Sequence, residues 1–141
     1  KGTIPAGMDY DPPVISLDIM ATIAALAGAE PAEDRPLDGV NRVPFLTGEA
    51  AGQPHERLFW RKFAQDAAAV RAGKNKLVSE GQRAQDNYQL FDLDSDIRES
   101  NDLMGQSPET ARTLLRQWEV WNAGLKDRAF PTLMDDTWWE R

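Results

Sequence analysis

The spacing of apolar residues near the C-terminal end of the chain predicts one long amphipathic helix. These residues recur at intervals of three and four, which places them on a single helix face. They are Ala111, Leu114, Trp118, Trp121 and Leu125. Ser107 and Pro108 directly precede them and supply an N-cap and a first-turn proline. The pattern therefore predicts a helix over residues 107 to 126, with its two indoles facing a sheet.

Shorter runs with alternating character precede this helix and predict β-strands. The runs cover residues 58–63, 67–71, 76–79 and 88–93. A glycine-containing turn at 73–75 separates the second and third runs, and a polar segment at 81–87 leads into the fourth. Short turns between successive strands favour an antiparallel meander. We therefore expect an α+β fold, a small antiparallel sheet of about four strands covered by the C-terminal helix.

A second helix is predicted near the start of the chain, over residues 17 to 27. Ser16 is a candidate N-cap, Asp18 places negative charge in the first turn, and Gly28 is a typical helix stop. Apolar residues surround most of this helix, so we expect it to be buried on more than one side, as at the edge of a larger domain. The loop at 49–54 is the best boundary, which divides the chain into segments 1–53 and 54–141.

Composition narrows the classes of function. The 141 residues carry a net charge of -7, with a pI near 4.7, which argues against sequence-independent binding to nucleic acid or to an anionic membrane. No apolar run approaches the roughly 18 residues of a transmembrane helix. The absence of cysteine excludes disulfides, thiolate metal sites and a cysteine nucleophile in this segment. Because the chain begins at Lys1 rather than Met, we expect a fragment or a processed product.

The acidic stretch after the fourth predicted strand raises the question of calcium binding. Asp92, Asp94 and Asp96 have the D-x-D-x-D opening of an EF-hand loop. However, Ile97 stands where the loop needs glycine, and Leu103 stands where the bidentate glutamate belongs. We therefore interpret the acids as turn-forming residues and predict no metal site here.

No complete active site is visible in the residue types alone. His55 is the only histidine, and no G-x-S-x-G motif accompanies it, so a serine-based triad is not indicated. Arg71, Lys74 and Lys76 cluster around the second turn, where they would present positive charge to an anionic substrate or simply form a solvated hairpin tip, the more common outcome. Phosphate loops, dinucleotide fingerprints and zinc-spacing clusters are absent from the sequence.

Several segments together resemble the C-terminal part of sulfatases of the alkaline-phosphatase-like superfamily. The segments that carry the resemblance, in chain order, are ISLDIMATIAALAGA, RPLDGVNRVPFLTGE, PHERLFWR, AAAVRAGKNKLV and YQLFDLDSDIRESNDL. Their order and spacing agree with the family over almost all of residues 1 to 127. Ala21 and Ile97 stand where the family usually has proline, which affects local turn geometry only.

The resemblance implies a chemistry that lies outside this chain. Similar proteins hydrolyse sulfate esters with a formylglycine made from the first residue of a C/S-x-P/A-x-R motif, and with a calcium ion held by Asp and Asn residues. This chain has no cysteine, and none of its serines begins that motif. Lys1 does not match the family's catalytic lysine, which lies further upstream. We therefore expect no catalytic residue, metal or cofactor in this segment, and calcium and formylglycine in the parent protein.

The resemblance also implies how the two segments contribute. Residues 1–53 would form the edge of a large α/β domain, with helix 17–27 on its main sheet. Residues 54–141 would form the C-terminal subdomain, which is structural and lines one wall of the substrate pocket. The candidates for substrate contact are His55, Trp60 and Arg71.

The expected partners are the rest of the sulfatase chain and a sulfated small molecule or glycan. Trp138 and Trp139, in a tail over 130–141, either dock on the domain or mediate a homo-oligomer. The resemblance favours a periplasmic or secreted protein without fixing its localisation. Two alternatives stay open: a phosphoester or phosphonate hydrolase of the same superfamily, and a non-catalytic interaction module.

Overall fold

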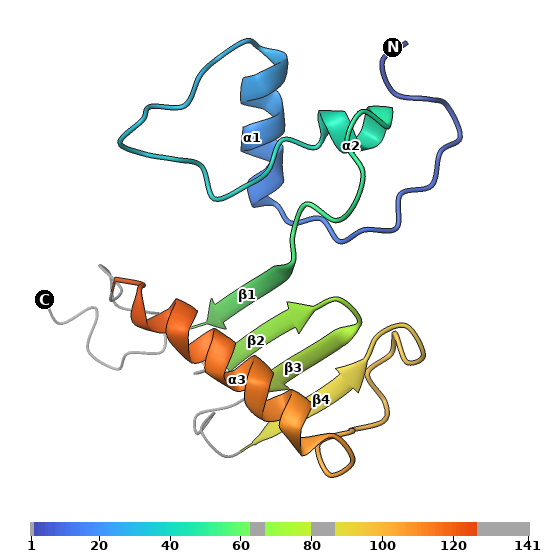
Figure 1. Ribbon diagram of the computed structural model, residues 1–141, viewed down its shortest axis with the longest axis vertical. Helices are drawn as coiled ribbons and strands as arrows, with labels where there is room; N and C mark the ends of the chain where they lie inside the picture. Colours follow the sequence, from blue (N-terminus) through green and yellow to red (C-terminus); the bar gives the residue numbers. More distant parts are fainter. Residues whose placement is uncertain (1, 63–66, 80–86, 127–141) are drawn as a thin grey trace, which may run out of the picture. The chain divides into compact units, whose positions relative to one another are not determined.

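A computed structural model describes residues 2–62, 67–79 and 87–126. The chain forms two compact units, Lys1–Glu56 and Arg57–Arg141, which are described separately below. Figure 1 shows that two helices and long connecting segments make up the first unit, whereas the second combines a sheet with a helix. In the part of the chain that the structure describes, no helix is long and apolar enough to span a membrane.

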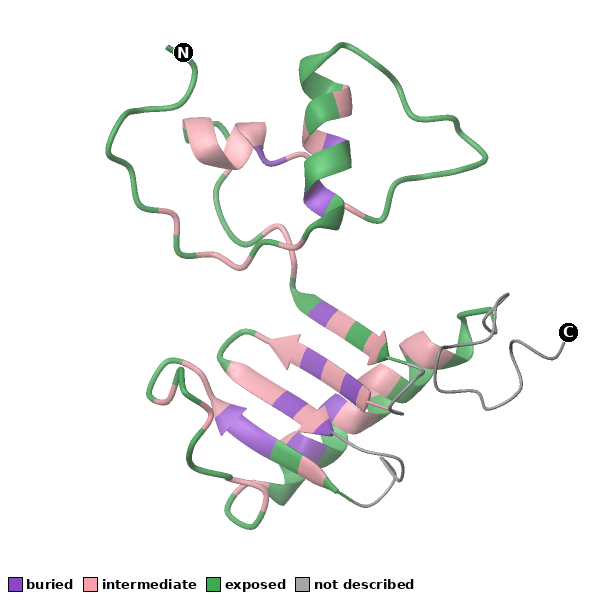
Figure 2. Ribbon diagram, turned by 180° about the vertical axis from the view of Figure 1, so that it is seen from behind, coloured by how far each residue is buried: buried purple, intermediate pink, exposed green. Residues whose placement is uncertain are grey.

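The first unit contains α1, Leu17–Leu26, and α2, Val43–Thr47. Gly48 ends α2 in the left-handed conformation with φ of 82°. Only Asp18 and Ala21 of α1 are buried. Its large apolar side chains are exposed, because nothing among the described residues of this unit covers them (Figure 2). The sequence predicts that these side chains are buried, as at the edge of a larger domain.

The second unit contains a four-stranded antiparallel sheet in the order β1-β2-β3-β4, which confirms the predicted meander. Its strands are β1, Arg57–Lys62; β2, Ala67–Ala72; β3, Asn75–Ser79; and β4, Tyr88–Asp92. Each strand alternates its side chains between the two faces of the sheet. The register aligns Phe59, Val70, Leu77 and Leu90 in one row across the four strands. This row therefore lies on a single face.

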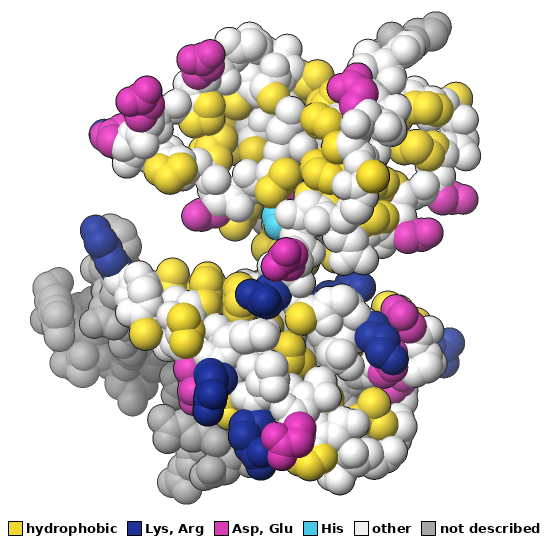
Figure 3. All heavy atoms as spheres, in the orientation of Figure 1, with side chains coloured by type: hydrophobic (Ala, Val, Ile, Leu, Met, Phe, Trp, Pro, Cys, Tyr) yellow, Lys and Arg dark blue, Asp and Glu magenta, His cyan; other side chains and the backbone are white. Residues whose placement is uncertain are grey.

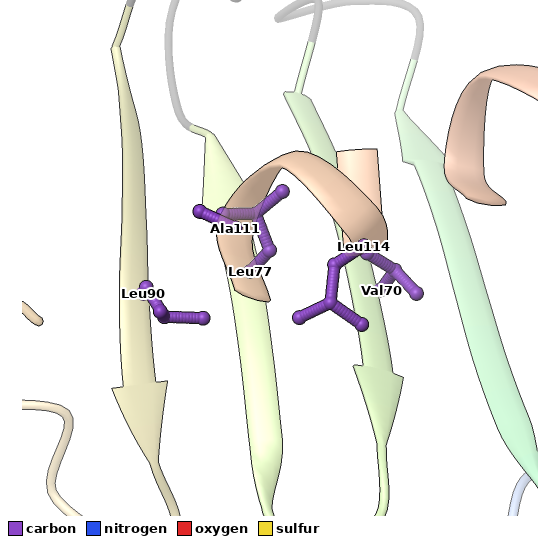
Figure 4. Close-up of a cluster of buried hydrophobic side chains, with 5 residues drawn as sticks. All are labelled: Val70, Leu77, Leu90, Ala111 and Leu114. Atoms are coloured by element: carbon purple, nitrogen blue, oxygen red, sulfur yellow. The ribbon is translucent and has the colours of Figure 1, made fainter. Parts of the chain in front are cut away.

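Helix α3, Pro108–Ala123, lies across that face and closes the core. Figure 4 shows the buried cluster that joins helix and sheet, in which side chains from β2, β3 and β4 meet two from α3. Its members are Val70, Leu77, Leu90, Ala111 and Leu114. The helix ends before the predicted residue 126 because Gly124 is its C-cap, so Leu125 lies beyond the helix and is exposed.

The tryptophans of α3 supply contacts to β1, as predicted. The Trp121 ring stacks on Phe59, with 5.2 Å between ring centroids and 11° between planes. The Trp118 indole Nε1 donates a hydrogen bond to the Trp60 carbonyl oxygen at 2.9 Å. Near the end of the helix, Arg61 Nη1 donates to the Asn122 side-chain oxygen at 2.6 Å. The predicted tail over 130–141 lies outside the described residues.

The acids that follow β4 shape turns, as the sequence indicates. Asp102 Oδ1 accepts hydrogen bonds from the backbone N–H groups of Leu90, at 3.0 Å, and Met104, at 2.9 Å. Asp96 Oδ2 accepts two backbone N–H groups, each at 2.8 Å. These bonds hold the connection between β4 and α3. The observed architecture is the predicted α+β class.

Candidate functional site

The three predicted substrate-contact residues lie in different units. His55 belongs to the first unit, whereas Trp60 and Arg71 lie on neighbouring strands of the second. The structure therefore brings Trp60 and Arg71 together on one sheet, and each unit offers its own cluster of polar and charged side chains.

In the first unit, His55 contacts a buried carboxylate on α1. Its Nε2 atom lies 2.8 Å from Asp18 Oδ1 and 3.0 Å from Oδ2. Asp18 also accepts the backbone N–H groups of Val40, at 3.0 Å, and Ile15, at 3.2 Å. Burial raises the pKa of Asp18, but these hydrogen bonds outweigh it, so that the pKa of Asp18 lies below its ordinary value of 3.8. Asp18 is therefore an ionised acceptor that joins distant segments.

Arg42 provides the positive charge beside this carboxylate. Its Nη1 lies 3.6 Å from Asp18 Oδ2, and both side chains are almost fully buried. Nη2 donates to the Tyr10 hydroxyl at 3.1 Å and to the Pro13 carbonyl oxygen at 3.2 Å. The guanidinium carbon also lies 5.1 Å from the Tyr10 ring centroid. We call Asp18, Arg42 and His55 the Asp18 cluster.

The Asp18 cluster is suited to structure rather than to catalysis. Asp18 is held by contacts inside the unit, whereas Arg42 Nε and Nη1 are buried without a hydrogen-bond partner. The cluster contains no nucleophile. The sequence indicates only a favourable helix-dipole position for Asp18, because Val40 and His55 lie 22 and 37 residues further along the chain. No local pattern connects them.

In the second unit, the face of the sheet opposite α3 carries a different group of side chains. Figure 2 shows the sheet in front of the helix on this side. The register places two rows on this face. The first row is Leu58, Arg71, Lys76 and Phe91, and the second is Trp60, Ala69, Val78 and Gln89. We call these two rows the open face.

Two cations lie directly opposite each other on the open face. Arg71 pairs with Lys76 across β2 and β3, and like charges in that position destabilise a sheet. Lys76 Nζ contacts Glu99 Oε1 at 2.6 Å. Arg71 Nε donates to the Gly73 carbonyl oxygen at 3.0 Å, and no carboxylate among the described residues pairs with Arg71. These two cations therefore have one carboxylate partner between them, Glu99, among the described residues.

Trp60 lies beside these cations on the same face, two residues along β1 from Leu58, which pairs with Arg71. It is 40% exposed, while Phe59 on the other face packs against the core. The open face therefore combines an accessible aromatic plane with two cations.

The predicted basic cluster around the second turn divides into two parts. Lys74 is at the hairpin tip and pairs with Asp92 at 2.6 Å; this hydrogen bond raises the pKa of Lys74 and lowers that of Asp92. Arg71 and Lys76 instead lie on the open face. Lys76 is not one of the three predicted substrate contacts, although the two-residue turn between Ala72 and Asn75 carries the signal that pairs it with Arg71.

Charge is distributed unevenly between the two units. Figure 3 shows Lys and Arg side chains gathered mainly on the second unit, and acidic side chains around the first. No group of three or more His, Cys, Asp or Glu residues within 2–62, 67–79 and 87–126 is placed to hold a metal ion.

Comparisons with known proteins place this arrangement in context. No family model matches the chain. The chain is 37% identical to a choline-sulfatase of Rhizobium meliloti (strain 1021) over 97 residues, which cover 64% of the chain and 18% of that protein. It is 45% identical to human steryl-sulfatase over 56 residues, or 40% of the chain and 10% of that protein.

Solved structures share the fold. The structure of Ps i-CgsB in complex with k-i-k-neocarrahexaose matches 99% of the chain and 31% of its own length, with a TM-score of 0.76 and 27% identity. BT1596, a 2-O GAG sulfatase, matches 81% of the chain and 27% of its own length, with a TM-score of 0.55 and 24% identity. The chain thus spans less than a third of each of these proteins.

Proposed function

We propose, for a chain that is homologous to sulfatases and looks like the C-terminal part of one, that the protein to which it belongs hydrolyses sulfate esters. The observation that carries the proposal is the 37% identity to a choline-sulfatase over 97 residues. That stretch is too long for agreement on a single turn or helix.

In this proposal the chain contributes support and one wall of the substrate pocket. The Asp18 cluster fixes α1, and the exposed apolar side chains of α1 pack on the rest of the sulfatase chain. Trp60 and Arg71 contact the substrate from the open face. His55, whose ring is held by Asp18, acts as a positioning residue rather than as a direct contact.

The chemistry of the ester cleavage is proposed to come from elsewhere in the protein. A formylglycine requires a cysteine or a suitably placed serine, and this chain offers neither. The described residues also provide no cluster of carboxylates for calcium. The described residues therefore do not fit a calcium site, the sequence offers no formylglycine precursor, and the part of this chain is to bind and orient the ester. Because the catalytic groups lie elsewhere, we propose that the chain alone is inactive. From the likeness to sulfatases, we propose a periplasmic or secreted location for the whole protein.

The test is to express the complete protein and to measure hydrolysis of matched sulfate and phosphate esters. The panel is 4-nitrophenyl sulfate, choline sulfate, a sulfated oligosaccharide, and 4-nitrophenyl phosphate as the matched phosphoester. We expect release of sulfate from at least one ester by the complete protein and none by residues 1–141 alone. Turnover of the phosphate ester only would favour the related phosphoester hydrolase. Activity of the isolated chain would contradict the placement of the active site.

A further inference from the structure

We propose that the open face is a subsite for a second anionic group of a multiply sulfated saccharide, and that Lys76 and Arg71 together bind this group. The inference rests on the proposed function and narrows it. The substrate would be a saccharide with at least one sulfate besides the ester that is cleaved.

The charge of the open face favours an anion. Arg71 and Lys76 are cross-strand partners, with Cβ atoms expected about 5 Å apart. Only Lys76 has a carboxylate partner, Glu99, among the described residues. A sheet that places two cations opposite each other with one counter-charge between them loses stability, and an anion bound across the pair would restore it.

Arg71 and Lys76 together carry more N–H donors than their contacts among the described residues use. A guanidinium group carries five N–H donors and an ammonium group three. The contacts found among the described residues use Arg71 Nε, toward Gly73, and one donor of Lys76, toward Glu99. The Nη groups of Arg71 and two donors of Lys76 remain to bind the oxygens of a sulfate. Arginine is also well matched to planar arrays of anionic oxygens.

An aromatic residue lies beside the two cations. Trp60 projects from the same face as Arg71 and is 40% exposed. An accessible indole offers an apolar plane for the C–H face of a sugar ring, with its polar edge toward water. A small ester such as choline sulfate has no second group to use both the plane and the two cations. The combination therefore favours a saccharide.

A structural role for the two cations is the competing explanation. Leu58 and Phe91 flank them in the same row and are buried. The aliphatic stems of Arg71 and Lys76 would help to cover these side chains. Methionine keeps an apolar stem of similar length without the charge, so methionine variants separate packing from anion binding.

The experiment uses the complete enzyme with Arg71→Met, Lys76→Met and the double variant. Arg112→Met is the matched control, because it removes an exposed arginine on α3 that pairs with Glu109. Binding of a multiply sulfated hexasaccharide and of its chemically desulfated form is measured by calorimetry. Kinetics on the sulfated hexasaccharide and on 4-nitrophenyl sulfate are measured in parallel.

We expect the double variant to raise the Kd and the KM of the sulfated hexasaccharide by about tenfold to a hundredfold. The binding of the desulfated form and the midpoint of thermal unfolding should stay near those of the parent enzyme, and the kcat/KM for 4-nitrophenyl sulfate should fall much less than that for the hexasaccharide. The Arg112→Met control should behave like the parent enzyme. Weaker salt dependence of hexasaccharide binding in the double variant would support the same conclusion.

Two results would overturn the subsite. Unchanged Kd for the hexasaccharide in the double variant would show that the cations do not bind it. An equal loss for both substrates, together with a lower unfolding midpoint, would assign the cations to packing or to contact with the rest of the chain. Hexasaccharide binding does not require turnover, so an enzyme that binds it through Arg71 and Lys76 but releases no sulfate would refute the proposed function alone.

Discussion

Replacing Asp18 by asparagine tests whether the Asp18 cluster holds the first unit together. The side-chain oxygen Oδ1 accepts the N–H of Val40, and Oδ2 accepts the N–H of Ile15 and faces Arg42. An asparagine has one carbonyl oxygen and one NH₂ group. Whichever way the amide is turned, its NH₂ group meets another donor. The variant therefore loses at least one hydrogen bond and leaves Arg42 buried without its counter-charge.

The magnitude follows from this loss. Removing one partner of a buried ion pair costs about 3–5 kcal/mol, and a hydrogen bond to a charged group contributes about 1.5–3 kcal/mol. Since asparagine keeps one acceptor, we expect Asp18→Asn to lower the free energy of unfolding of the first unit by about 3 kcal/mol. That corresponds to roughly a hundredfold to two-hundredfold increase in the opening equilibrium.

Hydrogen exchange is the appropriate assay, because it measures opening segment by segment. All five tryptophans follow residue 57, so tryptophan fluorescence would miss changes in the first unit. Exchange should accelerate at the amides of α1 and of Val40, and stay unchanged in the sheet. The matched control is Asp34→Asn, whose salt bridge to Arg35 is exposed and contributes little. A change of less than about threefold in Asp18→Asn would refute the reasoning.

Three further predictions address packing and pH. Gly39→Ala should lower the stability of the first unit by about 2 kcal/mol or more, because the added Cβ would lie 2.1 Å from the Leu17 carbonyl oxygen. Gly105→Ala in the second unit, where nothing lies within 4 Å of the added Cβ, is the control. Hydrogen exchange is measured in α1 for the first variant and in α3 for the control. Leu77→Ala should lower the free energy of unfolding of the second unit by about 3 kcal/mol. Urea unfolding followed by tryptophan fluorescence measures this change. A loss below about 1 kcal/mol would contradict the central place of Leu77 in the core. The pKa of Asp18 is lowered in the folded unit. The stabilisation that the Asp18 carboxylate provides should therefore be complete above pH 3.8, its ordinary pKa, and be lost as pH falls through the lowered pKa. Hydrogen exchange measured over an acid titration should show this loss in the parent chain and not in Asp18→Asn.

The sequence predicts elements whose causes are local. The interval of the apolar residues in α3, and the Ser-Pro pair at its start, depend only on neighbours in the chain. The turn between β2 and β3 likewise sets its own register, which is why the meander could be predicted. The apolar repeat predicts too late an end for α3, because it continues to Leu125 although the helix ends at Ala123 with Gly124 as its C-cap.

The clusters could not be predicted in the same way, because their members are brought together by the fold. His55 lies 37 residues from Asp18, and the N–H of Val40 lies 22 residues from it. His55 on its own therefore indicates a candidate ligand contact, and only the fold reveals the carboxylate that holds its ring. Lys76 shows the intermediate case, since its pairing with Arg71 follows from the turn, but the face on which both lie follows from the position of α3.

The orientation of α1 connects these observations with the proposed function. An ordinary surface helix turns its apolar side inward and its charges outward. In α1 the buried residues are Asp18 and Ala21, while Ile19, Ile23 and Leu26 are more than half exposed. The Asp18 cluster fixes this inverted orientation. If the carboxylate turned toward water, the N–H groups of Ile15 and Val40 would lose their acceptor and Arg42 its counter-charge. Burying one such apolar side chain is worth about 1.5–3 kcal/mol. An exposed stripe held in place by a buried ion pair is thus consistent with a helix whose apolar side packs against the rest of a sulfatase.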